Sequence, residues 1–311
     1  MDLDIFFQDQ NKKKQVKILT CGSVDDGKST LLGRLLFDSQ NIFIDQMNQA
    51  KIESEKYGTQ GKEIDLALLV DGLQAEREQG ITIDVAYRYF ETSNCKFIVA
   101  DTPGHEQYTR NMATGASNSD VAIILIDAQK GLLEQTRRHS FIVNLLGIKH
   151  VVVAINKMDL VNYNENIFET IVDEYKKLIK NFTFTSINFI PLSALKGDNV
   201  FLNFENTKWY KGLTLIETLE KVDVLDSSQN NELSFPVQWV NRSSANFRGY
   251  SGTIAGGKIA RGDLITTASS NMLTSVKNIF GPKGKLNEAY SGQAITLTLS
   301  DELDISRGDV I

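Results

Sequence analysis

Short apolar runs alternate with stretches of helical spacing between residues 16 and 222. The runs with the length and apolar content of buried strands are 16–20, 97–100, 121–126, 151–155 and 187–190. The stretches that place apolar side chains at helical intervals are 31–36, 132–146 and 164–180. This order predicts the α/β class, with a mostly parallel sheet covered by helices on both faces.

Two of these segments also predict which side chains are buried. Apolar positions alternate through residues 81–89, which predicts a strand whose buried face carries Ile81, Ile83, Val85, Tyr87 and Tyr89. A turn would join this strand to the one at 97–100 as a hairpin. The helix predicted at 132–146 has one apolar face with Phe141, Ile142, Leu145 and Leu146.

The pattern changes after residues 223–232, a polar stretch that we expect to be a linker. Beyond it the apolar runs are short, rich in β-formers and separated by glycines or turn residues. We therefore expect residues 1–222 to form an α/β domain and residues 233–311 to form a small antiparallel β-barrel.

Composition narrows the class of protein. The 311 residues suggest about two domains. The formal net charge of −6 lacks the overall excess of positive charge typical of proteins that bind nucleic acid. No apolar stretch is long enough to cross a membrane. Two cysteines without metal-ligand spacing suit a reducing compartment. We expect a cytoplasmic protein without a nucleic-acid or membrane partner.

One stretch between the first strand and the first helix matches the pattern G-x-x-x-x-G-K-[ST]. It reads Gly22, Ser23, Val24, Asp25, Asp26, Gly27, Lys28 and Ser29, followed by Thr30. Strand, glycine loop and helix are the context in which backbone N–H groups converge on phosphate oxygens. We expect Lys28 to reach the β- and γ-phosphates of a nucleotide, and the Ser29 hydroxyl to bind Mg²⁺.

A second loop follows the strand at 97–100 and begins with Asp101-Thr102-Pro103-Gly104. Its acidic residue stands at the carboxyl end of a strand, where open α/β sheets bind ligands. Asp101 can hold Mg²⁺ through water, and Gly104 lets its N–H approach a γ-phosphate.

Two further loops carry residue types that recognise guanine. Asp159 can accept hydrogen bonds from guanine N1–H and the 2-amino group, and adenine lacks this pair of donors. Lys157 can lie along the ring, and Asn156 can tie its loop to the phosphate loop. The backbone N–H groups of Ser193, Ala194 and Leu195 can face guanine O6. The sequence thus predicts GTP as the nucleotide.

Taken together, these motifs resemble the translational class of GTPases over residues 16–311. The resemblance implies that Thr82 binds Mg²⁺ and closes over the γ-phosphate, and that His105 orients the attacking water. It implies that Val24 and Ile81 form an apolar gate beside His105, and that Asp25 holds a monovalent cation such as K⁺. The sequence assigns no chemistry to His139.

A closer resemblance is to the GTPase subunits of bacterial sulfate adenylyltransferases. The segments that carry it are 22–29, 65–84, 101–117 and 135–140. Elongation factors have His-Val-Asp-His or His-Val-Asp-Ser where this chain has Ser23-Val24-Asp25-Asp26. The resemblance implies that GTP hydrolysis drives formation of adenosine 5′-phosphosulfate and pyrophosphate from ATP and sulfate. A separate catalytic subunit would perform the adenylyl transfer, giving a heterodimer.

Two other functions stay open at this point. One is an elongation-factor-like GTPase that delivers tRNA or acts on the ribosome. The other is a nucleotide-binding module with negligible turnover. The resemblance also implies a second barrel, which we expect to be missing from these residues.

Overall fold

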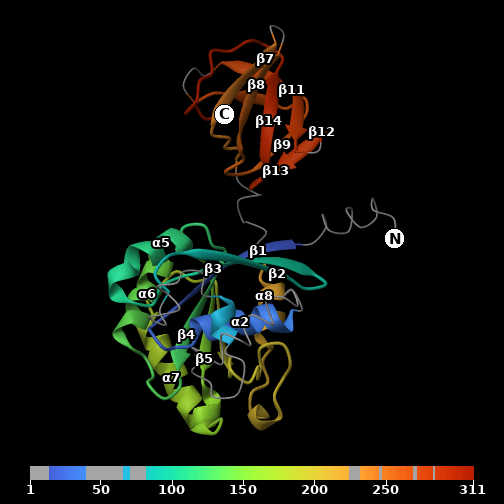
Figure 1. Cartoon of the computed structure of the whole chain (residues 1–311). Coiled ribbons are helices and arrows are strands. Elements are labelled where there is room, and N and C mark those ends of the chain that lie inside the picture. Colours follow the sequence, from blue (N-terminus) through green and yellow to red (C-terminus); the bar gives the residue numbers. More distant parts are fainter. Residues whose placement is uncertain are drawn as a thin grey trace, which may run out of the picture. The chain divides into compact units, whose positions relative to one another are not determined.

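The computed structural model describes residues 14–39, 66–70, 82–223, 232–244, 247–268, 272–282 and 284–311. The chain divides into two compact units, residues 1–222 and 223–311 (Figure 1). We describe each unit by itself.

The first unit is built on a six-stranded sheet in the order β2-β3-β1-β4-β5-β6. Its strands are β1 (Lys14–Gly22), β2 (Ala86–Glu91), β3 (Cys95–Asp101), β4 (Val121–Asp127), β5 (His150–Asn156) and β6 (Ser186–Pro191). Only β2, at the edge, runs antiparallel to its neighbour. All seven residues of β4 are buried, as expected for a central parallel strand covered on both faces. The predicted fold class is confirmed.

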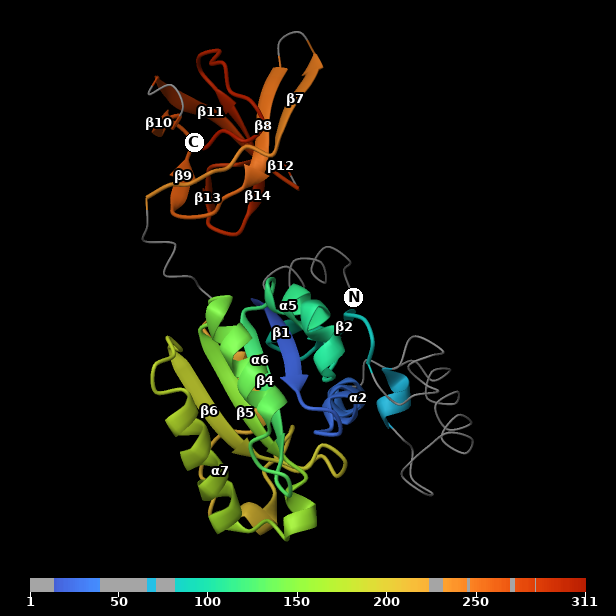
Figure 2. The ribbon, with the colours of Figure 1, turned by 90° about the vertical axis from the view of Figure 1, so that its left-hand side faces the viewer.

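Helices cover both faces of this sheet. The helices α5 (Thr109–Ala116), α6 (Glu134–Leu145) and α7 (Glu165–Leu178) lie on one face, and α2 (Lys28–Asp38) and α8 (Leu215–Lys221) lie on the other (Figures 1 and 2). Short 3-10 helices are η1 (Leu66–Leu69), η2 (Glu106–Tyr108), η3 (Met158–Val161) and η4 (Glu205–Thr207). Under α5, α6 and α7 the core includes Met112, Val143 and Tyr175.

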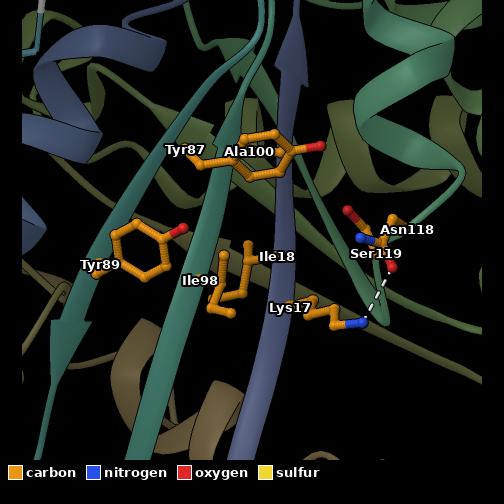
Figure 3. A pocket seen from close by; sticks show the side chains of 8 residues that line it. All are labelled: Lys17, Ile18, Tyr87, Tyr89, Ile98, Ala100, Asn118 and Ser119. Atoms are coloured by element: carbon orange, nitrogen blue, oxygen red, sulfur yellow. Dashed lines mark hydrogen bonds between the residues drawn. The ribbon is translucent and has the colours of Figure 1, made fainter. Parts of the chain in front are cut away.

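The predicted buried face of the edge strand is wrong at its two tyrosines, whereas Val85 does pack against the core. The strand β2 begins at Ala86, and Ile81 lies outside the described residues. Tyr87 and Tyr89 are 41% and 66% exposed, whereas Phe90 is buried and stacks on Phe97. The tyrosines share their face with Ile98 and Ala100 of β3, where they line a cavity of about 310 Å³ (Figure 3). Because this cavity is open to solvent, both tyrosine rings remain exposed.

The predicted apolar face of α6 is wrong for all but Ile142, which packs against the core. Phe141, Leu145 and Leu146 are exposed, and the buried residues of the helix are Thr136, His139, Ser140 and Val143. Two of these polar side chains have hydrogen-bond partners below the helix. The hydroxyl of Ser140 lies 3.0 Å from the hydroxyl of Tyr175, and the ring of His139 accepts from the backbone of Gly22. Internal hydrogen bonds thus replace apolar contact on part of the inward face.

The second unit is the predicted small antiparallel β-barrel. Its strands are β7 (Trp239–Ser244), β8 (Phe247–Thr253), β9 (Lys258–Ala260), β10 (Leu264–Thr266), β11 (Leu273–Gly281), β12 (Gly284–Leu286), β13 (Glu288–Tyr290) and β14 (Ala294–Leu299). Every pairing among them is antiparallel. The core includes Phe235, Tyr250, Ile279 and Leu297. Most of the expected linker, residues 224–231, lies outside the described residues.

Across the described ranges, no helix combines the length and the apolar character needed to cross a membrane.

The packing of α2 against η1 generates a prediction. A Cβ added at Gly33 would lie 2.0 Å from the carbonyl oxygen of Leu66. Replacing glycine by alanine inside a helix ordinarily stabilises it by about 0.5–1 kcal/mol. Here we expect Gly33→Ala to lower the free energy of unfolding by about 1–3 kcal/mol, because backbone must move to admit the methyl group. Urea unfolding measures this, and an unchanged or raised stability would contradict the packing.

Candidate functional site

Parallel pairing brings the predicted loops to one edge of the sheet. The strands β1, β3, β4, β5 and β6 point the same way, so their carboxyl ends lie side by side. The loop that we call the P-loop, residues 22–30, follows β1. Asp101 ends β3, Asn156 ends β5, and residues 192–195 follow β6. This edge is the ligand-binding edge of open α/β sheets.

The P-loop has the backbone geometry of a phosphate cradle. Asp25 and Gly27 adopt positive φ angles of 67° and 91°. Ser23 N–H donates to the Asp26 carboxylate at 2.6 Å, which closes the turn, while burial raises the pKa of Asp26. The helix α2 begins at Lys28 with no side-chain cap, so the N–H groups of its first turn can bind an anion.

The loop also positions the lysine. The Nζ of Lys28 donates to Ser23 O at 2.7 Å and to Gly22 O at 3.3 Å, and burial lowers the pKa of this amine. Gly104 of the second loop packs directly against it, since a Cβ at Gly104 would lie 2.4 Å from the Nζ. Only a glycine lets the backbone approach the lysine this closely.

Asp101 lies beside the P-loop strand. Its carboxylate is buried and accepts from the Thr20 hydroxyl at 3.2 Å. The hydroxyl of Ser29 stands in the first turn of α2. Carboxylate and hydroxyl oxygens are suitable ligands for Mg²⁺, so the donor set fits this ion. Thr82 lies in the segment before β2 and forms no hydrogen bond with the P-loop in the described part of the chain.

Asn156 joins the two halves of the site. Its Nδ2 donates to Asp26 O at 2.7 Å, and its Oδ1 accepts from Ala194 N at 2.9 Å. Gly27 is again the only residue type that fits, because a Cβ there would lie 2.4 Å from the Asn156 Nδ2. One buried amide therefore connects the P-loop to the loop after β6.

The loop after β6 is also fixed from α2. The guanidinium of Arg34 donates to Ala194 O at 3.2 Å and to Leu195 O. Ser193 N–H donates to Asp198 O at 3.2 Å. Because Ala194 N–H already donates to Asn156, Leu195 is the one residue of the predicted three whose N–H has no hydrogen bond among the described residues.

Asp159 and Lys157 follow Asn156 and lie at the same edge. The Asp159 side chain is 7% exposed, with one carboxylate oxygen 3.9 Å from the Nζ of Lys196. The Nζ of Lys157 lies 2.9 Å from the carboxylate of Asp127, the last residue of β4. Lys157 is thereby held along the edge beside Asp159.

Two of the remaining predicted side chains, those of His105 and Asp25, are exposed. His105 is exposed, and its Nδ1 accepts from Gln107 N–H at 3.3 Å as the cap of η2. The Asp25 carboxylate, for which the resemblance implied a monovalent cation, lies 3.7 Å from the Nζ of Lys130 in a largely exposed ion pair. Val24 is half-buried, and its expected gate partner Ile81 is outside the described residues.

Three contributors escaped the sequence-based prediction. Asp127 could have been found, because it ends a buried strand as Asp101 does. Arg34 and His139 could not, because each acts from within a helix on backbone atoms of a distant loop. The cavity of Figure 3 contains none of the predicted site residues.

A P-loop, a buried carboxylate at the neighbouring strand end and an Asn-Lys-x-Asp loop are the features of a P-loop GTPase domain. Residues 13–247 match the family described as "Elongation factor Tu GTP binding domain". The chain belongs to this family.

Curated relatives share a more specific name. The protein named "Sulfate adenylyltransferase subunit 1" from Cellvibrio japonicus is 56% identical over 310 residues, which covers 100% of this chain and 66% of the relative. Its namesake from Aliarcobacter butzleri is 58% identical over 311 residues, with the same coverage. The chain thus spans slightly less than two thirds of the length of these relatives.

Solved structures support the fold. The S. cerevisiae Ski7 GTPase-like domain, crystallised with GDP and inorganic phosphate, has a TM-score of 0.60 at 20% identity, covering 100% of this chain and 77% of that one. A structure of sup35 complexed with GDP has a TM-score of 0.51 at 25% identity, covering 96% of this chain and 66% of that one.

The Asn156 bridge generates a prediction. Asn156→Ala should lower the free energy of unfolding by about 2 kcal/mol or more, because Asp26 O and Ala194 N–H lose buried partners at about 1–3 kcal/mol each. Asn166→Ala is the control, since Asn166 is exposed on α7 and its loss should change stability by less than about 0.5 kcal/mol. Urea unfolding compares the two, and equal effects would contradict the bridge.

Proposed function

We propose that this chain binds GTP with Mg²⁺ and hydrolyses it as the GTPase subunit of a sulfate adenylyltransferase. The observation that carries the proposal is its identity of 56–58% to proteins named subunit 1 of that enzyme, over the whole of this chain. The convergence of the P-loop, Asp101, Asn156 and Asp159 on one edge of the sheet supports it.

The proposed roles follow from this arrangement. The N–H groups of the P-loop and the amine of Lys28 bind the phosphates. Asp159 accepts from the guanine N1–H and 2-amino groups, Lys157 lies along the ring, and the Leu195 N–H faces O6. Asn156 keeps the phosphate and base subsites at a constant separation.

Ser29, Thr82 and Asp101 would hold Mg²⁺, which neutralises charge on the β- and γ-phosphates when bound. Because Thr82 forms no hydrogen bond with the P-loop within the described ranges, we propose that it joins the site only when its segment closes over the γ-phosphate. His105 then orients the attacking water from the loop that packs against Lys28. A K⁺ ion at Asp25 would share that carboxylate with Lys130, which pairs with one of its oxygens.

Energetics explain why a GTPase would accompany adenylyl transfer. Forming adenosine 5′-phosphosulfate and pyrophosphate from ATP and sulfate is strongly uphill, since a phosphate–sulfate anhydride is made. GTP hydrolysis can drive it only if the catalytic subunit binds the GTP and GDP states with different affinity. We therefore propose a cytoplasmic heterodimer in which the second subunit binds ATP and sulfate.

The test is GTP turnover by the chain mixed with its host's catalytic subunit. Turnover stimulated by that subunit, ATP and sulfate supports the proposal. Turnover stimulated by ribosomes, with no effect of sulfate, would favour an elongation-factor-like function. Absence of turnover under both conditions would indicate a nucleotide-binding module with negligible turnover. Unstimulated GTPases of this class are already slow, with rates of about 10⁻⁴ to 10⁻² s⁻¹.

Asp159→Asn tests the base-recognition role. Since an amide presents a donor where guanine needs an acceptor, we expect GTP affinity to fall by about tenfold or more and xanthosine triphosphate affinity to rise. Competition binding with both nucleotides measures the change. Asp173→Asn on the exposed face of α7 is the control and should change neither affinity. Unchanged GTP affinity in the Asp159 variant would reject the role.

His105→Ala tests the water-orienting role. We expect GTP affinity to stay nearly unchanged, because His105 is exposed and contacts only its own loop, while single-turnover hydrolysis falls by about 100-fold. Single-turnover assays of phosphate release measure hydrolysis, and equilibrium binding measures GTP affinity, so the two effects are separated. Lost binding together with lost hydrolysis would indicate a structural role.

A further inference from the structure

Three side chains on adjacent turns of α6 contact two loops of the proposed GTP site. Gln135 Nε2 donates to Gly104 O at 3.4 Å, and an Nη of Arg138 lies 2.8 Å from a carboxylate oxygen of Glu106. The Nδ1 of His139 accepts from Gly22 N–H at 3.2 Å. The first two contacts flank His105, and the third holds the first residue of the P-loop.

We propose that Gln135, Arg138 and His139 are positioning residues for GTP hydrolysis, which hold the loop with His105 and the P-loop at a constant separation. This inference rests on the proposed function. In it, α6 serves as the common support of the phosphates and of the group that orients the attacking water. A displacement of α6 would then change the rate of hydrolysis through both loops together.

His139 is suited to this task because its ring is neutral. Burial, with the positive charges of Lys28 and Arg138 nearby, lowers its pKa to about 4. A neutral ring whose Nδ1 accepts from Gly22 carries its proton on Nε2. That Nε2 has no partner within the described ranges, an arrangement that costs free energy when buried. The tautomer that accepts from the P-loop therefore leaves a buried donor unpaired among the described residues, which lowers the free energy of unfolding.

The contact with Gly22 extends to the lysine. A Cβ at Gly22 would lie 2.8 Å from Leu125 O, so the residue is confined between β4 and His139. The carbonyl of the same residue accepts from Lys28 Nζ at 3.3 Å. His139, Gly22 and Lys28 thus form a continuous chain of hydrogen bonds from α6 to the proposed phosphate subsite.

The pair of Arg138 and Glu106 lies nearer to solvent, with side chains 32% and 70% exposed. Such pairs contribute little to global stability. Their loss should therefore leave the fold intact and affect mainly the position of the short loop that they anchor. This separation makes the pair the better target for a test.

The test is a charge-reversal cycle in the full chain, with Arg138→Glu, Glu106→Arg and the double variant. We expect each single variant to slow single-turnover GTP hydrolysis by about two- to fivefold, with GTP affinity and melting temperature nearly unchanged. The double variant should recover most of the wild-type rate, since it restores the pair between positions 106 and 138 but not the exposed pair of Arg138 with Glu134 at 3.4 Å. Arg137→Glu is the control. Arg137 is exposed at the position before Arg138, so the same charge change there should leave the rate of hydrolysis unaffected.

A second comparison addresses His139. His139→Asn keeps an acceptor near the position of Nδ1, whereas His139→Leu removes it at similar volume. We expect the leucine variant to hydrolyse GTP more slowly than the asparagine variant at matched thermal stability.

Two results would overturn the inference while the wild-type chain hydrolyses GTP. One is a charge-reversal cycle without rescue, and the other is equal hydrolysis by the two His139 variants. If the wild-type chain bound no GTP, the proposed function would fail first and the inference with it, so the two failures are distinguishable.

Discussion

The buried amide of Asn156 is the contact on which the site depends. It donates to the P-loop at Asp26 O and accepts from the loop after β6 at Ala194 N. The β5 strand that carries it is buried and paired in parallel with β4 on one side and β6 on the other, which fixes the backbone from which the amide projects. The distance between a phosphate subsite and a base subsite is thereby set by a buried strand with parallel neighbours on both sides.

The sheet and its functional edge could be predicted because they depend on strong local signals. Continuous apolar runs predict buried parallel strands, and the residues that follow each run must then meet at one edge. Asp101, Asn156 and Asp159 were found in this way. Nothing more than the order of strands along the chain was needed to place them at the same edge.

The errors have a common physical origin. Tyr87 and Tyr89 alternate like a buried face, but they belong to an edge strand and line an open cavity, so they remain exposed. In α6 Phe141 and Leu145 are exposed, while His139 and Ser140 face inward because each finds a hydrogen-bond partner below the helix. A pattern of apolar positions cannot reveal partners supplied by a distant strand or helix. The same limit hid the role of Arg34, which acts on backbone carbonyls after β6.

We propose that one guanine nucleotide spans the P-loop and the Asp159 loop. A crystal structure of the chain with Mg²⁺ and a non-hydrolysable GTP analogue tests this most directly. We predict the phosphates against Lys28 and the first turn of α2, with the base hydrogen-bonded to Asp159 in the same molecule. A nucleotide bound elsewhere, or one whose base lies away from Asp159 while its phosphates contact Lys28, would contradict the claim.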